Sequence, residues 1–127
     1  LMVAGGAVQK YGPQLEDHQQ LLIAAADILI EIYMAESAIL RTEKNVKRTS
    51  QKEQSAQIAM AKLYLYHAVD TVEEKGKESI ISFAEGDEQR MMLMGLKRFT
   101  KYTNYPDIVD LRIEIAEKVK EENSYCF

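Results

Sequence analysis

The chain has 127 residues, enough for one domain with its own core and too few for two. Its composition is 46% hydrophobic and 28% charged, and the formal net charge of −4 argues against general nucleic-acid binding, which requires a basic surface. Six Gly and two Pro among abundant helix-forming residues predict helices. The single cysteine, Cys126, excludes an internal disulfide and a multi-thiolate metal site, and it fits a reducing compartment.

The first two predicted helices meet at the Gly12–Pro13 pair, which disfavours helix at both positions and ends the first helix near Tyr11. We expect the first helix to begin upstream of Leu1. The second is predicted from Gln14 to Lys47, roughly 50 Å long. Two neighbouring apolar stripes predict that other helices contact it on two sides. The first stripe comprises Leu22, Ala26, Leu29, Tyr33 and Leu40, and the second comprises Ala25, Ile28, Ile32, Ala35 and Ile39.

Three further helices are predicted. Ser50 and Glu53 match a capping box before the third helix. The sequence leaves open whether that helix continues past Gly76, because a glycine inside a helix costs about 1 kcal/mol relative to alanine. The fourth helix begins at Gly86, and Pro106 is placed in a turn near the first residue (N1) of the last helix. Their apolar faces comprise Ile58, Ala61, Leu65, Ala68 and Val72 in the third helix, Met91, Met92, Leu96, Phe99 and Tyr102 in the fourth, and Ile108, Leu111, Ile115 and Val119 in the last.

The predicted fold is all-α, because no segment of useful length alternates at period two. Long helices joined by short connections favour an antiparallel up-and-down helical bundle, with four main helices plus a short N-terminal helix end. We expect residues 1–127 to form one helical domain. The apolar run at 21–32 contains Asp27 and Glu31 and is too short to cross a bilayer, so we expect a cytoplasmic protein.

Reactive constellations are not predicted anywhere in the chain. His18 and His67 each lack a second His or Glu three or four residues away, so the usual zinc and di-iron patterns are missing, and we expect both rings on half-exposed helix faces. Cys126 is the penultimate residue, where a nucleophile is held poorly. The Gly5–Gly6 pair lacks the spacing of a phosphate-binding loop. We therefore predict no catalytic, cofactor-binding or metal-binding residue.

Glu36 interrupts the first apolar stripe of the second helix, between Tyr33 and Leu40. A glutamate on a buried face must be paired or carry a large desolvation cost. Two interpretations remain open: a buried ion pair with a lysine or arginine of another helix, or a general base with a perturbed pKa.

A basic stretch between residues 41 and 52 is the sharpest charge feature of this acidic chain. It could form a docking patch for anionic lipid, an acidic protein surface or ligand phosphates. The alternative is a solvated helix end, where cations also interact favourably with the helix dipole. The candidate docking residues are Arg41, Lys44, Lys47, Arg48 and Lys52.

The run from Ile30 to Lys44 (IEIYMAESAILRTEK) resembles the extra C-terminal segment of acyl-CoA dehydrogenases of the very-long-chain type. The preceding Val8–Gln9–Lys10–Tyr11, the long third helix, and the terminal aromatic residues Tyr125 and Phe127 fit the same layout. The matching residues are helix-packing residues rather than reactive ones. The resemblance covers nearly the whole chain.

The resemblance implies that the chain is a C-terminal fragment of a larger flavoenzyme. The catalytic core of that family binds FAD and removes hydrogens from Cα and Cβ of an acyl-CoA, with a glutamate as base, in fatty acid β-oxidation. No position here matches those flavin or base motifs, so no active-site residue is carried over. The implied role is an accessory helical domain without chemistry of its own, which packs on the core of the same chain and supports a homodimer. The alternative is a peripheral membrane module that uses the basic stretch, although no lipid-inserting helix is evident.

Overall fold

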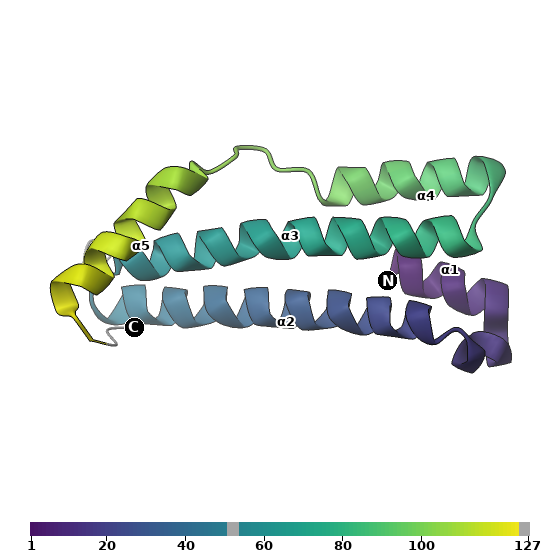
Figure 1. Cartoon of the computed structure of the whole chain (residues 1–127), viewed down its shortest axis with the longest axis horizontal. Coiled ribbons are helices and arrows are strands. Elements are labelled where there is room, and N and C mark those ends of the chain that lie inside the picture. Colours follow the sequence, from purple (N-terminus) through teal and green to yellow (C-terminus); the bar gives the residue numbers. More distant parts are fainter. Residues whose placement is uncertain (51–53, 125–127) are drawn as a thin grey trace. The chain divides into compact units, whose positions relative to one another are not determined.

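The computed structural model describes residues 1–50 and 54–124. These residues form α-helices and one short 3-10 helix, without strands, which confirms the all-α prediction (Figure 1). The elements in chain order are α1 (Met2–Tyr11), the 3-10 helix η1 (Gly12–Asp17), α2 (Gln19–Arg48), α3 (Ser55–Phe83), α4 (Gly86–Phe99) and α5 (Ile108–Glu122).

The break after the first helix is longer than the sequence predicted. Gly12 has a φ of 50°, in the left-handed region that favours glycine, and Pro13 lies in the first turn of η1. The six residues of this 3-10 turn and the non-helical His18 separate α1 from α2. The predicted start of the second helix at Gln14 is therefore wrong, and α2 begins at Gln19.

The third helix continues through Gly76 to Phe83, which answers the question that the sequence left open. A Cβ atom added to Gly76 would lie 2.9 Å from Leu96 Cδ1, so the glycine lets α4 pack closely against α3. This packing offsets the low helix propensity of glycine. The fourth helix ends at Phe99, so the prediction that Tyr102 belongs to it is wrong.

The last helix is capped by a side chain. The Asp107 carboxylate accepts hydrogen bonds from the backbone N–H groups of Val109 at 3.0 Å and Asp110 at 3.1 Å. Pro106 lies directly before this cap, two residues before the first helical residue Ile108 and thus close to its predicted place near N1. The predicted capping box of the third helix includes Glu53, which lies outside the described residues.

The chain forms two compact units. Unit 1 comprises Leu1–Ile32 with Val69–Tyr102, and unit 2 comprises Tyr33–Ala68 with Thr103–Phe127. In each unit, segments of α2 and α3 lie side by side with opposite chain directions (Figure 1). This arrangement is the antiparallel pairing that an up-and-down bundle requires.

Unit 1 contains a core made by three helices. Its buried residues are Ala7 from α1, Ile80, Phe83 and Ala84 from the end of α3, and Leu96 from α4. In unit 2, Ala35 of α2 and Ala56 and Ala59 of α3 are buried. There the Asn45 side-chain amide donates a 2.8 Å hydrogen bond to Gln57 Oε1, which links α2 to α3.

Gly5 and Gly6 form a matched pair for testing the core of unit 1. A Cβ atom on Gly6 would lie 2.6 Å from Phe83 Cε2 and 2.7 Å from Met92 Cε, whereas a Cβ on Gly5 would meet nothing within 4 Å. We expect Gly6→Ala to lower the free energy of unfolding by about 1–3 kcal/mol, because the buried Phe83 ring must shift. Gly5→Ala should raise it by about 0.5–1 kcal/mol through helix propensity. Urea unfolding followed by circular dichroism measures both, and equal effects would contradict the packing.

Candidate interaction surfaces

No metal centre is present among the described residues, where no group of three or more His, Cys, Asp or Glu side chains could hold an ion. His18 lies between η1 and α2 rather than on a helix face, so that part of the prediction is wrong. Its ring stacks on Tyr11 with a centroid distance of 3.7 Å and an interplanar angle of 30°. The Tyr11 hydroxyl donates to the Ser82 carbonyl at 3.3 Å. Tyr11 thereby joins His18 to the end of α3.

The second histidine lies on α3 and is exposed. His67 Nε2 is 3.5 Å from the guanidinium Nη2 of Arg112 on α5, and its ring meets Tyr66 edge-on with centroids 5.5 Å apart. Because Arg112 can only donate, this contact requires Nε2 to be the accepting nitrogen. The contact links α3 to α5 within unit 2.

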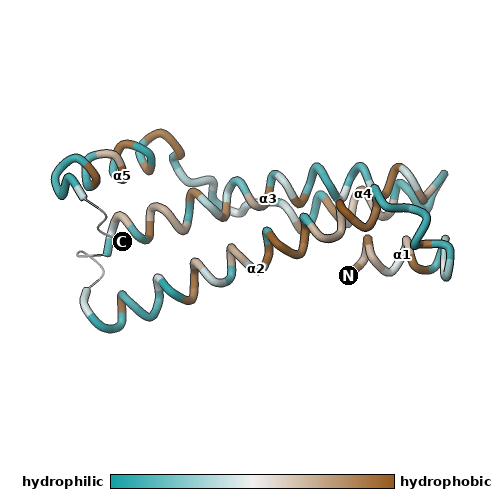
Figure 2. The backbone as a smooth tube through the Cα atoms, turned by 60° about the horizontal axis from the view of Figure 1, so that its bottom comes forward, coloured by the Kyte–Doolittle hydropathy of each residue, from teal (hydrophilic) through white to brown (hydrophobic). Residues whose placement is uncertain are grey.

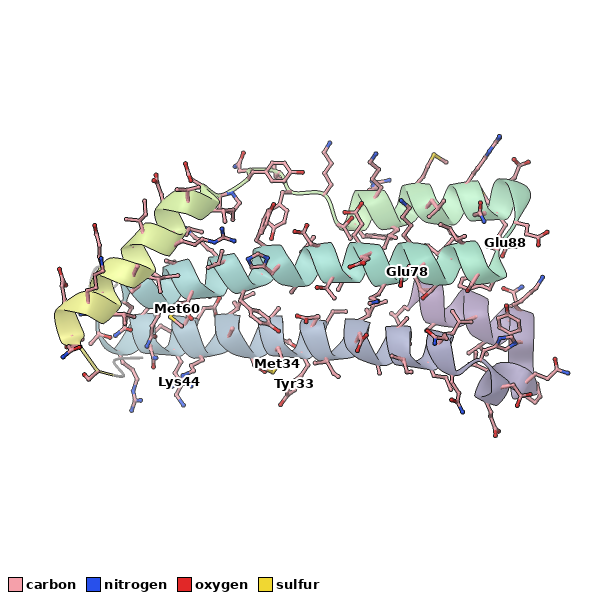
Figure 3. All side chains as sticks on the ribbon, viewed as in Figure 1. Tyr33, Met34, Lys44, Met60, Glu78 and Glu88 are labelled. Carbon is pink, nitrogen blue, oxygen red and sulfur yellow. The ribbon has the colours of Figure 1, made fainter. Side chains whose placement is uncertain are left out.

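The first apolar stripe of α2 is open to solvent. Leu29 is 67% exposed, Tyr33 69% and Leu40 58%, so the prediction that a helix of this chain covers the stripe is wrong. Figure 3 shows Tyr33 and Met34 pointing away from α3. Most of the second stripe faces inward, because Ala35 is buried and Ala25, Ile28 and Ile39 are partly buried, whereas Ile32 is 51% exposed. The hydropathy colours of Figure 2 show apolar residues recurring along α2.

Glu36 is exposed on this same open face. Both interpretations, the buried ion pair and the general base, required a buried Glu36, and both are therefore wrong for this chain. The physical reason is that its stripe neighbours Tyr33 and Leu40 are themselves exposed, so nothing removes water from the carboxylate.

The predicted docking residues lie at the C-terminal end of α2. Arg41, Lys44, Lys47 and Arg48 are all exposed, with Lys47 and Arg48 in the last turn. Figure 3 shows Lys44 pointing away from α3. The last predicted member of the patch, Lys52, lies outside the described residues.

An apolar pocket in unit 1 was not predicted from the sequence. Its volume is about 720 Å³, and side chains of four helices line it, among them Met2, Ile28, Ile32, Val72, Leu96 and Phe99. Periodicity assigned most of these residues to a core, and it does not tell a filled core from one that leaves a hollow. A large apolar surface of this kind is typical of an interface or a ligand-binding groove.

None of the helices in residues 1–50 and 54–124 combines the length and the apolar content needed to cross a bilayer. Three candidate surfaces for interaction are the open face of α2, the basic end of that helix and the pocket of unit 1.

Comparison with known proteins places this helical arrangement in a family. A sequence model described as acyl-CoA dehydrogenase, C-terminal domain, matches residues 1–98. The chain belongs to this family. The resemblance to the C-terminal domain of acyl-CoA dehydrogenases is thereby confirmed, while the very-long-chain type stays a prediction.

Two relatives support the assignment of this chain to the acyl-CoA dehydrogenase C-terminal domain family. A probable acyl-CoA dehydrogenase of Bacillus subtilis (strain 168) is 34% identical over 125 residues, which cover 98% of this chain and 21% of that protein. The crystal structure of an acyl-CoA dehydrogenase complexed with FAD from Bacillus anthracis matches with a TM-score of 0.95 and 37% identity. That match covers 100% of this chain and 22% of the other. The chain thus spans about a fifth of the length of these relatives.

We expect the pocket to bind a neutral apolar dye such as Nile red. Ile32→Glu should weaken this binding by about fivefold or more, because a polar group placed in an apolar pocket costs about 1 kcal/mol or more. Ile81→Glu is the control, since Ile81 is 52% exposed, like Ile32 at 51%, and does not line the pocket. Fluorescence titration measures both variants. Equal weakening would mean that the dye does not enter the pocket.

Proposed function

We propose that this chain is the accessory C-terminal helical domain of an FAD-dependent acyl-CoA dehydrogenase of the very-long-chain type. In this role residues 1–127 form one domain that packs on the catalytic core of the same chain and supports the homodimer. The domain has no chemistry of its own, and the core carries out the oxidation of acyl-CoA in fatty acid β-oxidation. The protein is cytoplasmic.

The observation that carries this proposal is the match of the whole chain to one part of an FAD-containing acyl-CoA dehydrogenase, with a TM-score of 0.95. The matched part is 22% of that enzyme. A domain that matches only one part of a longer enzyme is expected to pack against the catalytic core of that enzyme.

The pocket of unit 1 supports a docking role. Its apolar lining and its volume of about 720 Å³ suit the side chains of an apolar helix from the core. Burial of such a surface stabilises an interface by roughly 25 cal/mol per Å² of apolar area before the cost of association is subtracted. We therefore assign the pocket to contact with the core.

The same pocket does not fit FAD. Every residue that lines it has an apolar side chain or, at Gly76, none. The pyrophosphate of a dinucleotide requires hydrogen-bond donors, usually backbone N–H groups at a helix N-terminus or basic side chains. We therefore place FAD in the core of the parent enzyme.

Removal of these 127 residues from the parent chain tests the proposal. We expect FAD to stay bound and the turnover of acyl-CoA to change by less than about twofold, because no catalytic group lies in this domain. The melting temperature should fall by about 5 °C or more, because the core loses several kcal/mol of interface burial. Light scattering should report an altered oligomer. An unchanged mass, stability and rate would contradict the proposal, as would FAD bound to the pure 127-residue chain.

A second candidate function is docking to an anionic lipid surface through Arg41, Lys44, Lys47, Arg48 and Lys52. The exposure of the first four favours it, because each cation near such a surface contributes about 1 kcal/mol. These positive charges lie together at the C-terminal end of α2, although the net charge of the whole chain is −4.

Vesicles that contain phosphatidylserine test this second function. We expect binding that weakens with salt, and a decrease of at least about tenfold for Lys47→Glu combined with Arg48→Glu. The control is Lys97→Glu combined with Arg98→Glu, because this pair also occupies the last turn of a helix and changes the net charge equally. Co-sedimentation measures all three proteins. Binding that is indifferent to salt, or that both double variants weaken equally, would dismiss the basic end of α2 as a lipid site.

A further inference from the structure

A second pocket of unit 1 has polar walls, and we call it the polar pocket. Its volume is about 450 Å³, which lies within the range of small-molecule sites. Its walls are the C-terminal end of α1, the link from η1 to the first turns of α2, and the C-terminal part of α3. It shares no lining residue with the apolar pocket that we assign to the catalytic core. The two pockets can therefore bind different partners.

The charge of the polar pocket is negative. Asp17 of η1 and Glu78 of α3 line it, and no lysine or arginine of the described part of the chain does so. Carboxylates that line one concavity raise the local concentration of cations, because walls of low dielectric constant focus their field. The charge of the pocket therefore favours a cationic ligand.

The hydroxyl groups of the polar pocket have already donated their hydrogens. Tyr11 donates to the Ser82 carbonyl at 3.3 Å, and Ser82 donates to the Ser79 carbonyl at 2.7 Å. Ser79 in turn donates to the Lys75 carbonyl at 2.8 Å. Because a hydroxyl has one hydrogen and two lone pairs, these three groups can offer a ligand only lone pairs. The carboxylates also accept, so the pocket suits a ligand that donates several hydrogen bonds.

An ammonium group already contacts one of the two carboxylates. Lys75 Nζ lies 3.4 Å from Glu78 Oε2, one turn away on α3, and Glu78 is 60% exposed. Exposed ion pairs of this kind contribute little to stability. A carboxylate has two accepting oxygens, so a ligand can share Glu78 with Lys75 or displace it.

We propose that the polar pocket binds a small linear amine, whose ammonium group is held by Asp17 and Glu78. An ammonium group has three N–H donors and no acceptor, which matches a site of carboxylates and accepting hydroxyls. Its hydrogen bonds to carboxylates are charge-assisted and therefore stronger than bonds between neutral groups. Leu21, which is partly buried, and Ala24, which is buried, supply an apolar surface for the carbon chain. This assignment does not depend on the proposed function.

Calorimetric titration of the 127-residue chain with pentylamine at low ionic strength tests the site. We expect saturable binding of one molecule per chain. Pentyltrimethylammonium has the same charge and carbon chain but no N–H group, and it should bind at least about fivefold more weakly, because it cannot donate to the carboxylates. No measurable binding of pentylamine, or equal binding of the two cations, would overturn the proposal.

Paired variants locate the binding. Asp17→Asn combined with Glu78→Gln should weaken the binding of pentylamine by at least about tenfold, because both charged acceptors are lost. The control is Glu16→Gln combined with Glu74→Gln. These glutamates are exposed on η1 and α3, do not line the polar pocket, and change the net charge equally. The control should change the affinity by less than about twofold. Equal weakening by the two pairs would mean that the net charge alone attracts the amine, and would overturn the site.

The competing lysine provides a test in the opposite direction. Lys75→Met should strengthen the binding of pentylamine by about twofold or more, because the ligand then has Glu78 to itself. Lys77→Met is the control, since Lys77 is exposed on the same helix and its removal changes the net charge equally. A Lys75→Met variant that binds no more tightly than this control would contradict the role of Glu78.

Titration of the parent enzyme distinguishes a free amine from a basic side chain of the catalytic core. A pocket that serves a free ligand stays open, so the parent should bind pentylamine as tightly as the 127-residue chain does. Binding to the parent that is at least about tenfold weaker would mean that the core covers the pocket, and it would overturn the free amine as the ligand. Neither result changes the accessory role, which removal of the domain tests separately.

Discussion

The close approach of α1 to α3 and α4 is the contact on which unit 1 depends. Gly6 lets the buried Phe83 ring and Met92 lie where a Cβ atom would otherwise be, and Gly76 does the same for Leu96. Both glycines therefore trade helix propensity for contact between helices. The buried cluster that joins α1, α3 and α4 follows from these two approaches.

The two faces of α2 differ in what covers them. Its inner face, with Ala35, packs within the chain, whereas Leu29, Tyr33 and Leu40 remain exposed. An exposed apolar face along a long helix is costly in water and is typical of a surface that another chain or domain covers.

The proposed function depends on packing surfaces rather than on reactive groups. The chain belongs to the acyl-CoA dehydrogenase C-terminal domain family, and its relatives are several times longer than the matched part. The proposed role assigns the concave apolar pocket of unit 1 to contact with the catalytic core. A concave apolar pocket suits the apolar side chains of a neighbouring element.

The sequence by itself determined the helical fold, since period-two alternation is missing and the Gly12–Pro13 pair and Gly86 mark helix ends close to their observed places. It also determined the two stripes of α2, but not which of them another helix of the chain covers, because periodicity shows that a face is apolar and not what lies against it. For the same reason Glu36 was placed in a core that the chain does not build there. Only the tertiary structure decided the continuation of α3 through Gly76, the stacking of His18 on Tyr11 and the pocket of unit 1, because each depends on side chains that are distant in sequence or on how completely they fill a space.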